Sequence, residues 1–169
     1  NRLMIIRSSN LATNLLMERV TCARVDAFIK ELGIENMTVI RGLEDKKAYR
    51  LGMNNAASAR SSTQMMKLIA EGKVVSRKVC DEIIEVMFGQ EFNESIPAQL
   101  PAGVKVAHKT GWTGDFFHDT GIIFPPNRKP YALSLFTHGF PEDDENQAHG
   151  CMAEVSGMVY KELVENNRK

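Results

Sequence analysis

One alternating run, from Val104 to Asp115, constrains the fold of this chain more than any other segment. Its side chains fall on two faces of an extended backbone, with Val104, Val106 and His108 on one and Lys105, Ala107 and Lys109 on the other. This is the pattern of a half-buried strand, and it ends in Lys-Thr-Gly at 109–111. Two more strand-like runs, 118–124 and 131–138, follow at once. Three short strands in such close succession predict an antiparallel meander.

Helical patterns account for most of the remaining sequence. Apolar residues recur at helical spacing over about 10–17, 22–32, 61–70, 77–88 and 147–164. Ser8-Ser9-Asn10 and Ser76 offer side-chain oxygens to the free N–H groups of a helix start. Residues 35–57 show no such spacing and predict a long ordered surface loop, and the acidic residues 142–145 predict a turn. Helices, then a meander, then a final helix is an α+β pattern.

Composition limits the kinds of partner. Lys plus Arg and Asp plus Glu both total 21, so the formal net charge of the 169 residues is zero. No long-range field therefore favours nucleic acid or an anionic membrane surface. No apolar run approaches the roughly 20 residues of a membrane-spanning helix. Cys22, Cys80 and Cys151 are expected to be buried free thiols. His138, His149 and Cys151 match no standard metal spacing, so we expect no metal and no cofactor.

Two triplets resemble motifs of a known superfamily. Ser8-Ser9-Asn10 before a helix and Lys109-Thr110-Gly111 at a strand resemble the S-D-N and K-T-G motifs of the serine β-lactamases and penicillin-binding proteins. Either triplet alone is a weak signal. The flanking segments Met4–Leu16 and Asp119–Pro126 resemble the same family, most closely its class A branch, and the order is kept along essentially the whole chain. Ser9 stands where the family usually has an Asp of mainly structural role.

The resemblance implies a β-lactamase/transpeptidase-like fold with part of it missing. Residues 1–101 would belong to the helical domain, including the long loop, and 102–169 would supply strands and the C-terminal helix of the α/β domain. The family's nucleophile lies in an S-x-x-K motif upstream of S-D-N, and no Ser-x-x-Lys occurs in these 169 residues. We expect a portion of a longer protein that lacks the N-terminal strands and the nucleophile helix and is inactive alone.

The resemblance also assigns roles in acyl transfer to a serine. Ser8 Oγ would relay a proton to the departing nitrogen, and Lys109 would orient Ser8 and attract the substrate carboxylate. Thr110, in one motif with Gly111, would bind that carboxylate, and Asn10 would hold the acylamino carbonyl of the substrate. The structural alternatives are helix capping for Ser8 and Asn10 and a solvated strand end for Lys109 and Thr110.

Two further assignments concern the oxyanion and the water that completes hydrolysis. By resemblance, the backbone N–H of Trp112 would be one of two oxyanion-hole donors. Glu44, in Glu44-Asp45-Lys46-Lys47, is the nearest candidate for the class A glutamate that activates water, although the family's E-x-x-L-N pattern is not matched. Its alternative is a solvated charge run. His108 and His118 are interpreted as structural.

The first functional interpretation is a portion of a β-lactamase-like serine hydrolase that opens β-lactam amide bonds through an acyl-enzyme. A D-alanyl-D-alanine peptidase or transpeptidase and a non-catalytic module of the same fold are the alternatives. The substrate would be a β-lactam or a cell-wall peptide, and the resemblance implies a periplasmic or secreted protein linked to antibiotic resistance. An unpaired sheet edge and an uncovered apolar face predict self-association or pairing with the missing segment.

Overall fold

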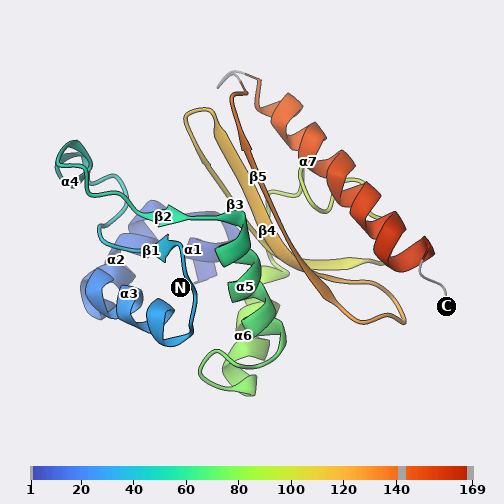
Figure 1. The fold of residues 1–169 in the computed structure, drawn as a ribbon, viewed down its shortest axis with the longest axis horizontal. Coiled ribbons are helices and arrows are strands. Elements are labelled where there is room, and N and C mark those ends of the chain that lie inside the picture. Colours follow the sequence, from blue (N-terminus) through green and yellow to red (C-terminus); the bar gives the residue numbers. More distant parts are fainter. Residues whose placement is uncertain (1, 141–143, 167–169) are drawn as a thin grey trace.

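The computed structural model describes residues 2–140 and 144–166. A helical segment precedes a three-stranded antiparallel sheet and a last helix, which confirms the α+β prediction (Figure 1). The helices are α1 (Arg2–Ile6), α2 (Asn10–Val20), α3 (Cys22–Glu31), α4 (Lys46–Arg50), α5 (Ala59–Ala70), α6 (Arg77–Met87), α7 (Glu145–Tyr160) and a π-helical turn, η1 (Lys161–Asn166). The strands are β1 (Met37–Thr38), β2 (Ala56–Ala57), β3 (Lys105–Thr113), β4 (Phe116–Phe124) and β5 (Tyr131–His138).

The predicted meander is the sheet β3-β4-β5. Its register pairs Lys105 with Phe124 at one end of β3 and Thr113 with Phe116 at the other. The Lys-Thr-Gly motif was predicted to end its strand, and that prediction is wrong because β3 continues through Thr113. The reason is that β4 begins two residues earlier than its apolar run indicated, so residues 112 and 113 also find ladder partners.

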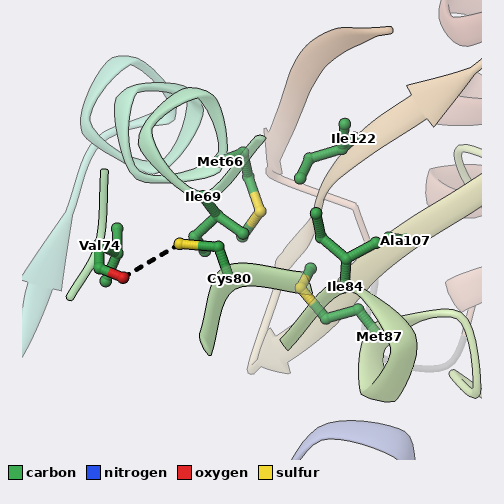
Figure 2. Close-up of a cluster of buried hydrophobic side chains, with 8 residues drawn as sticks. All are labelled: Met66, Ile69, Val74, Cys80, Ile84, Met87, Ala107 and Ile122. Atoms are coloured by element: carbon green, nitrogen blue, oxygen red, sulfur yellow. Dashed lines mark hydrogen bonds between the residues drawn. The ribbon is translucent and has the colours of Figure 1, made fainter. Parts of the chain in front are cut away.

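Both faces of the sheet are covered, as Figure 1 shows with α5 and α6 on one side and α7 on the other. Successive side chains of a strand point to opposite faces. Ile122 therefore packs among the residues of α5 and α6, and Ile123 packs with Ile96 and Tyr160 on the other face. Figure 2 shows the first cluster, made of Met66, Ile69, Val74, Cys80, Ile84, Met87, Ala107 and Ile122.

Cysteine burial differs along the chain. Cys80 is fully buried, and its Sγ lies 3.0 Å from the carbonyl oxygen of Val74 (Figure 2). Cys22 is half-buried and Cys151 is exposed, so the prediction of three buried thiols is confirmed only for Cys80 and is wrong for Cys151. Cys151 lies on α7 next to Met152, the residue that faces the sheet, and so it points away from the core.

The segment predicted as a long loop is closed by a small sheet. Met37 pairs with Ala57 and Thr38 with Ala56, and α4 lies in the sequence between these two strands. Asn55 stabilises the closure, because its Oδ1 accepts from the backbone N–H groups of Ile40 and Arg41 at 2.9 and 3.1 Å. The segment is therefore ordered, as predicted, but it is not free of secondary structure.

Helix starts follow the predicted caps. α2 begins at Asn10 and α6 follows Ser76, whose hydroxyl accepts from the Val79 N–H at 3.3 Å. In the predicted acidic turn, residues 142 and 143 lie outside the described residues, and Asp144 caps α7. No described helix has the length and apolarity required to cross a membrane.

Candidate active site

Ser8 and Lys109, 101 residues apart, meet through their side chains. Lys109 Nζ donates to Ser8 Oγ and also to the backbone carbonyl of Thr110. Ser8 follows α1 with a φ of +51°, in the sparsely populated left-handed region. Ser9, not Ser8, caps α2, because its Oγ accepts from the Ala12 N–H at 3.2 Å. The Ser8 hydroxyl is therefore available to Lys109 rather than used as a helix cap.

The position of Lys109 changes its proton affinity. Burial lowers the pKa of its ammonium to about 8, and the negative charge of Asp119 opposes that shift. At neutral pH Lys109 is still mostly charged, and it becomes neutral over the pH range just above. An ammonium with this pKa that donates to a serine hydroxyl can exchange a proton with it.

The long loop reaches the start of α2. Asn10 Nδ2 donates to Glu44 Oε1 at 2.7 Å. Asn14, one turn further along α2, holds the adjacent loop backbone, donating to the Leu43 carbonyl at 3.0 Å and accepting from the Leu43 N–H at 2.8 Å. The other part of the predicted charge run separates from Glu44, since Asp45 caps α4. The structure thus brings Glu44 to Asn10.

A groove of about 550 Å³ joins these residues. Its lining is Met4, Ile5, Ser8, Asn10, Thr13, Leu43, Lys109, Thr110, Gly111 and Trp112. Every predicted site residue except Glu44 lines it, and Glu44 contacts Asn10 at its border. Thr110 is 7% exposed, and its Oγ1 finds no hydrogen-bond partner among the described residues. A buried hydroxyl without a partner is a group that a ligand can satisfy.

The sequence analysis did not identify the apolar residues that line this groove, or the asparagine that holds the loop beside it. Met4 and Ile5 come from α1, a helix that the sequence did not predict, and Leu43 comes from the loop. Asn14 was a findable signal, because it lies four residues after Asn10 and therefore on the same face of α2.

The histidines and the exposed cysteine are dispersed. His138 Nε2 lies 3.2 Å from Asp115 Oδ2, whereas His149 Nδ1 lies 2.8 Å from Ser95 Oγ. Within residues 2–140 and 144–166, no three His, Cys, Asp or Glu side chains come together as a metal-ligand set. The arrangement in the groove is therefore one of hydroxyl, ammonium, amide and carboxylate groups.

Known proteins are similar to this chain in sequence. The carbapenem-hydrolyzing beta-lactamase KPC of Klebsiella oxytoca is 24% identical over 166 residues, which cover 95% of this chain and 56% of the relative. Beta-lactamase SME-1 of Serratia marcescens is 27% identical over 162 residues, covering 92% and 55%. The chain thus spans little more than half the length of these curated relatives.

Solved structures with the same fold are also similar to this chain. PBP-A superimposes with a TM-score of 0.86 at 29% identity, over 97% of this chain and 60% of that one. The TLA-3 extended-spectrum beta-lactamase gives a TM-score of 0.88 at 24% identity, over 96% and 62%, and at that identity it supports the fold alone. Residues 1–163 match the family model described as "Beta-lactamase enzyme family". Because this match covers nearly the whole chain, the protein belongs to the beta-lactamase enzyme family.

Proposed function

We propose that this chain is the C-terminal portion of a serine hydrolase that opens β-lactam amide bonds through an acyl-enzyme. The nucleophilic serine and its lysine would lie in a segment outside residues 1–169. The contact of Ser8 with Lys109 is the observation that carries this proposal, because it joins two motifs from distant parts of the chain in one groove. The 169 residues alone are then expected to bind substrate weakly and to form no acyl-enzyme.

In the proposed reaction Ser8 relays a proton. The leaving nitrogen must be protonated as the amide bond breaks, and the Ser8 hydroxyl is the donor. Lys109, which already donates to Ser8 Oγ, replaces that proton from its ammonium. The positive charge of Lys109 also attracts the carboxylate of the substrate, and the unpartnered Oγ1 of Thr110 donates to it. Gly111, with no side chain, leaves room for this carboxylate beside β3.

The amide of Asn10 has a second N–H besides the one that it donates to Glu44. In the proposal that N–H donates to the acylamino carbonyl of the substrate. The backbone N–H of Trp112 is one of two donors to the oxyanion, the other belonging to the absent nucleophile. Loss of one such donor typically costs about 3 kcal/mol of transition-state stabilisation.

Glu44 is proposed as the base for the deacylating water. Its carboxylate lies at the border of the groove, 2.7 Å from Asn10 Nδ2, and this contact fixes its direction. A water held by both side chains would be activated by Glu44 and directed at the acyl carbonyl. This contact favours a hydrolase over an enzyme that keeps its acyl group.

A D-alanyl-D-alanine peptidase or transpeptidase is the second candidate. The likeness to PBP-A favours it, and a single-residue mutant of that protein has been solved as an acyl-enzyme complex with penicillin G. A peptidase would be acylated in the same groove and would deacylate slowly. A non-catalytic module would keep the fold and never be acylated. Either catalytic candidate would act outside the cytoplasm, in the periplasm or after secretion, where cell-wall peptides and β-lactams are encountered.

Intact mass measurements with a penicillin separate these candidates. The 169-residue chain and the longest natural chain that contains it are each incubated with the antibiotic and sampled over time. A transient adduct on the longer chain only supports the hydrolase, and its Glu44→Gln variant is then expected to hold the adduct. A lasting wild-type adduct indicates the peptidase, and none indicates the non-catalytic module. An adduct on the short chain would contradict the roles assigned above.

The division into residues 1–101 and 102–169 and the partner segment belong to the same proposal. Within the described residues β5 pairs only with β4, and Leu3, Leu11 and Leu15 are each more than half exposed. We propose that the nucleophile-bearing segment covers both surfaces, and that the short chain otherwise self-associates. A monomer in sedimentation with a sharp thermal transition would contradict this.

A further inference from the structure

A buried histidine–carboxylate pair lies next to the Lys-Thr-Gly motif, and the proposed reaction does not use it. His108 is 1% exposed and Asp119 is 0% exposed. The His108 Nδ1 atom lies 2.9 Å from Asp119 Oδ1 and 3.2 Å from Oδ2. Asp119 Oδ2 also accepts from the Ile96 N–H at 3.0 Å. The carboxylate of Asp119 thus contacts both the imidazole of His108 and the backbone of Ile96 inside the core.

The second ring nitrogen of His108 also faces an acceptor. His108 Nε2 lies 3.2 Å from Asn93 Oδ1. The orientation of that amide is set by its other contact, since Asn93 Nδ2 donates to the Gln90 carbonyl at 3.0 Å. A carbonyl oxygen only accepts, so the amide nitrogen must face Gln90 and the amide oxygen must face His108.

Beside an ionised Asp119, the imidazole faces two acceptors, and both are satisfied only when each ring nitrogen carries a proton. A neutral ring has only one N–H, and it would leave either Asn93 or Asp119 facing a lone pair while the buried carboxylate kept an uncompensated charge. We propose that His108 is an imidazolium paired with Asp119, so that the buried pair is neutral overall, and that His108 is a positioning and charge-balancing residue for Lys109.

Geometry couples the pair to the groove. His108 and Lys109 are consecutive in β3, so their side chains leave opposite faces of the sheet. The strands β3 and β4 are tightly packed at His108. A Cβ added at Gly121, the register partner of His108, would lie only 2.7 Å from His108 Cβ. A change in the pair is therefore transmitted to the strand that carries Lys109.

Charge couples them as well. The carboxylate of Asp119 raises the pKa of Lys109 against the effect of burial, and an imidazolium beside Asp119 offsets that carboxylate. Other titratable groups lie on the elements around the pair. Glu94 is beside Asn93 in the loop, and His149 of α7 is hydrogen-bonded to Ser95. His118 and Glu145 line a pocket together with Thr110, the register partner of Asp119. Glu94 is exposed, so solvent screens it from the pair.

The first test reads protonation directly and does not depend on the proposed function. The longest natural chain is labelled with ¹⁵N-histidine, and the ring nitrogens are observed by NMR at pH 7. The described chain has four histidines, and the signal lost in His108→Gln identifies the relevant ring. Protons on both His108 nitrogens are expected. A bare ring nitrogen at pH 7 would overturn the proposal.

The second test rests on the proposed function and reads the coupling to Lys109. The acylation rate by a chromogenic cephalosporin is followed against pH for wild type, His108→Gln and the double variant His108→Gln/Asp119→Asn. The acylation rate is expected to fall at alkaline pH as Lys109 loses its proton, and this fall is the alkaline limb of the profile. The single variant leaves the charge of Asp119 uncompensated and so raises the pKa of Lys109, and its alkaline limb is expected about 0.5–1 pH unit higher. The double variant is neutral again, and its limb is expected to return to the wild-type position.

An unchanged limb in a folded single variant, or a shift that persists in the double variant, would overturn the positioning role. Far-UV and near-UV circular dichroism identify variants that are not folded. Where His108→Gln does not fold, Asp119→Asn takes its place. The buried imidazolium then loses its carboxylate partner, so a bare ring nitrogen is expected at pH 7 in this variant. The pair is neutral in both proteins, so the alkaline limb is expected at the wild-type position, and a shifted limb would overturn the charge balance. Wild type that forms no acyl-enzyme refutes the proposed function, while the NMR result still decides the state of His108.

Discussion

The two parts of this chain on either side of Ser58 bury their side chains to very different degrees. Between Ala59 and Tyr160 the sheet is covered on both faces, and Ile122 and Ile123 are 0% exposed. Between residues 2 and 57 only Ile29 and Ile34 are buried, whereas α1 and α2 bury no residue. Buried apolar area is the main source of stability, so the second part stabilises itself and the first depends on what it contacts.

The candidate site lies where these two parts meet. Lys109, Thr110 and Trp112 come from β3, whereas Ser8 lies in the connection between α1 and α2 and Asn10 is the first residue of α2. Near Ser8 the two parts are joined by the partly buried Ile5, which packs against the cluster around Ile84 and Ile122, and by polar contacts. Gln90 Nε2 donates to the Ile5 carbonyl at 2.9 Å, the Glu91 N–H donates to the Ile6 carbonyl at 3.1 Å, and Arg7 pairs with Glu91 at 2.8 Å. Site geometry therefore depends on a weakly buried element held against a rigid one.

Truncation of a buried and an exposed aliphatic side chain tests the comparison most strongly. Ile122→Ala leaves a cavity between the sheet and α5 and is expected to lower the free energy of unfolding by about 2–5 kcal/mol. Leu11→Ala removes a side chain that is 71% exposed, and a change within about 0.5 kcal/mol is expected in the 169-residue chain. Urea unfolding measures both, and similar losses for the two variants would contradict the comparison.

The same pair of variants sharpens the proposal of a missing segment. In the longest natural chain Leu11→Ala is expected to be more destabilising than in the 169-residue chain, because the proposed segment covers α2. Ile122→Ala is expected to give similar losses in both chains. An equal, small effect of Leu11→Ala in the two chains would show that α2 stays exposed.

Glycine positions give the next largest contrast. A Cβ at Gly121 would lie 2.7 Å from His108 Cβ and 2.9 Å from the Ala107 carbonyl, so Gly121→Ala must move one strand against another. A destabilisation of about 1–3 kcal/mol is expected from this overpacking. Gly150→Ala in α7 is the matched control, because its Cβ meets nothing within 4 Å, and it is expected to stabilise by about 0.5–1 kcal/mol. Thermal unfolding of both variants checks the sign of each change.

Much of the secondary structure between residues 59 and 160 could be predicted, because the sequence signals for it are local. The strand within 104–115 and the cap at Ser76 each depend on neighbouring residues, and both elements are confirmed. The strand is not half-buried as predicted, because Ala107 and His108 are buried on opposite faces. The prediction failed where structure depends on pairing across the chain. The strands β1 and β2 hold only two residues each, and their pairing of Met37 with Ala57 has no local pattern.

The candidate site also has features that local motifs predict and features that depend on contacts across the chain. Ser8 and Lys109 were found from short motifs, and their contact could be expected only through the family resemblance. The interpretation of His108 as structural missed its partner, because Asp119 reaches it only through the register that sets Thr110 opposite Asp119 and His108 opposite Gly121. Distances between side chains of different strands are fixed by register, and the sequence constrained register only loosely.

A smaller effect is expected in the pH dependence of stability. The pKa of Lys109 is about 8 in the folded chain against an ordinary value of 10.5, so between these pH values the unfolded chain holds a proton that the folded chain has released. Stability from this group therefore rises with pH across that window and is lost as pH falls through 8. With allowance for solvent screening, the change is about 1–2 kcal/mol.

Lys109→Met removes this titration and provides the reference. The difference in unfolding free energy between wild type and the variant is expected to increase from pH 8 to pH 10.5, as measured by urea unfolding at each pH. Other lysines and tyrosines titrate in both proteins and cancel in the difference. A flat difference curve would mean that Lys109 keeps an ordinary pKa, and the proton exchange proposed for Ser8 would lose its support.

The smallest expected effect on stability falls at the helix cap beside the site. Ser9 Oγ caps α2, and Ser9→Ala is expected to lower the free energy of unfolding by about 1 kcal/mol. Ser76→Ala removes the corresponding cap of α6 in the buried part, with a similar loss. Only the first should reduce acylation of the longest natural chain, because fraying of α2 displaces Ser8 and Asn10, whereas packing against the sheet holds α6 in place. Ser9→Asp restores a capping oxygen and is expected to restore both properties. Equal acylation in Ser9→Ala and wild type would mean that the contacts of residues 90 and 91 with α1 are enough to hold Ser8. Residues 2–57 would then keep their structure near the site although few of their side chains are buried.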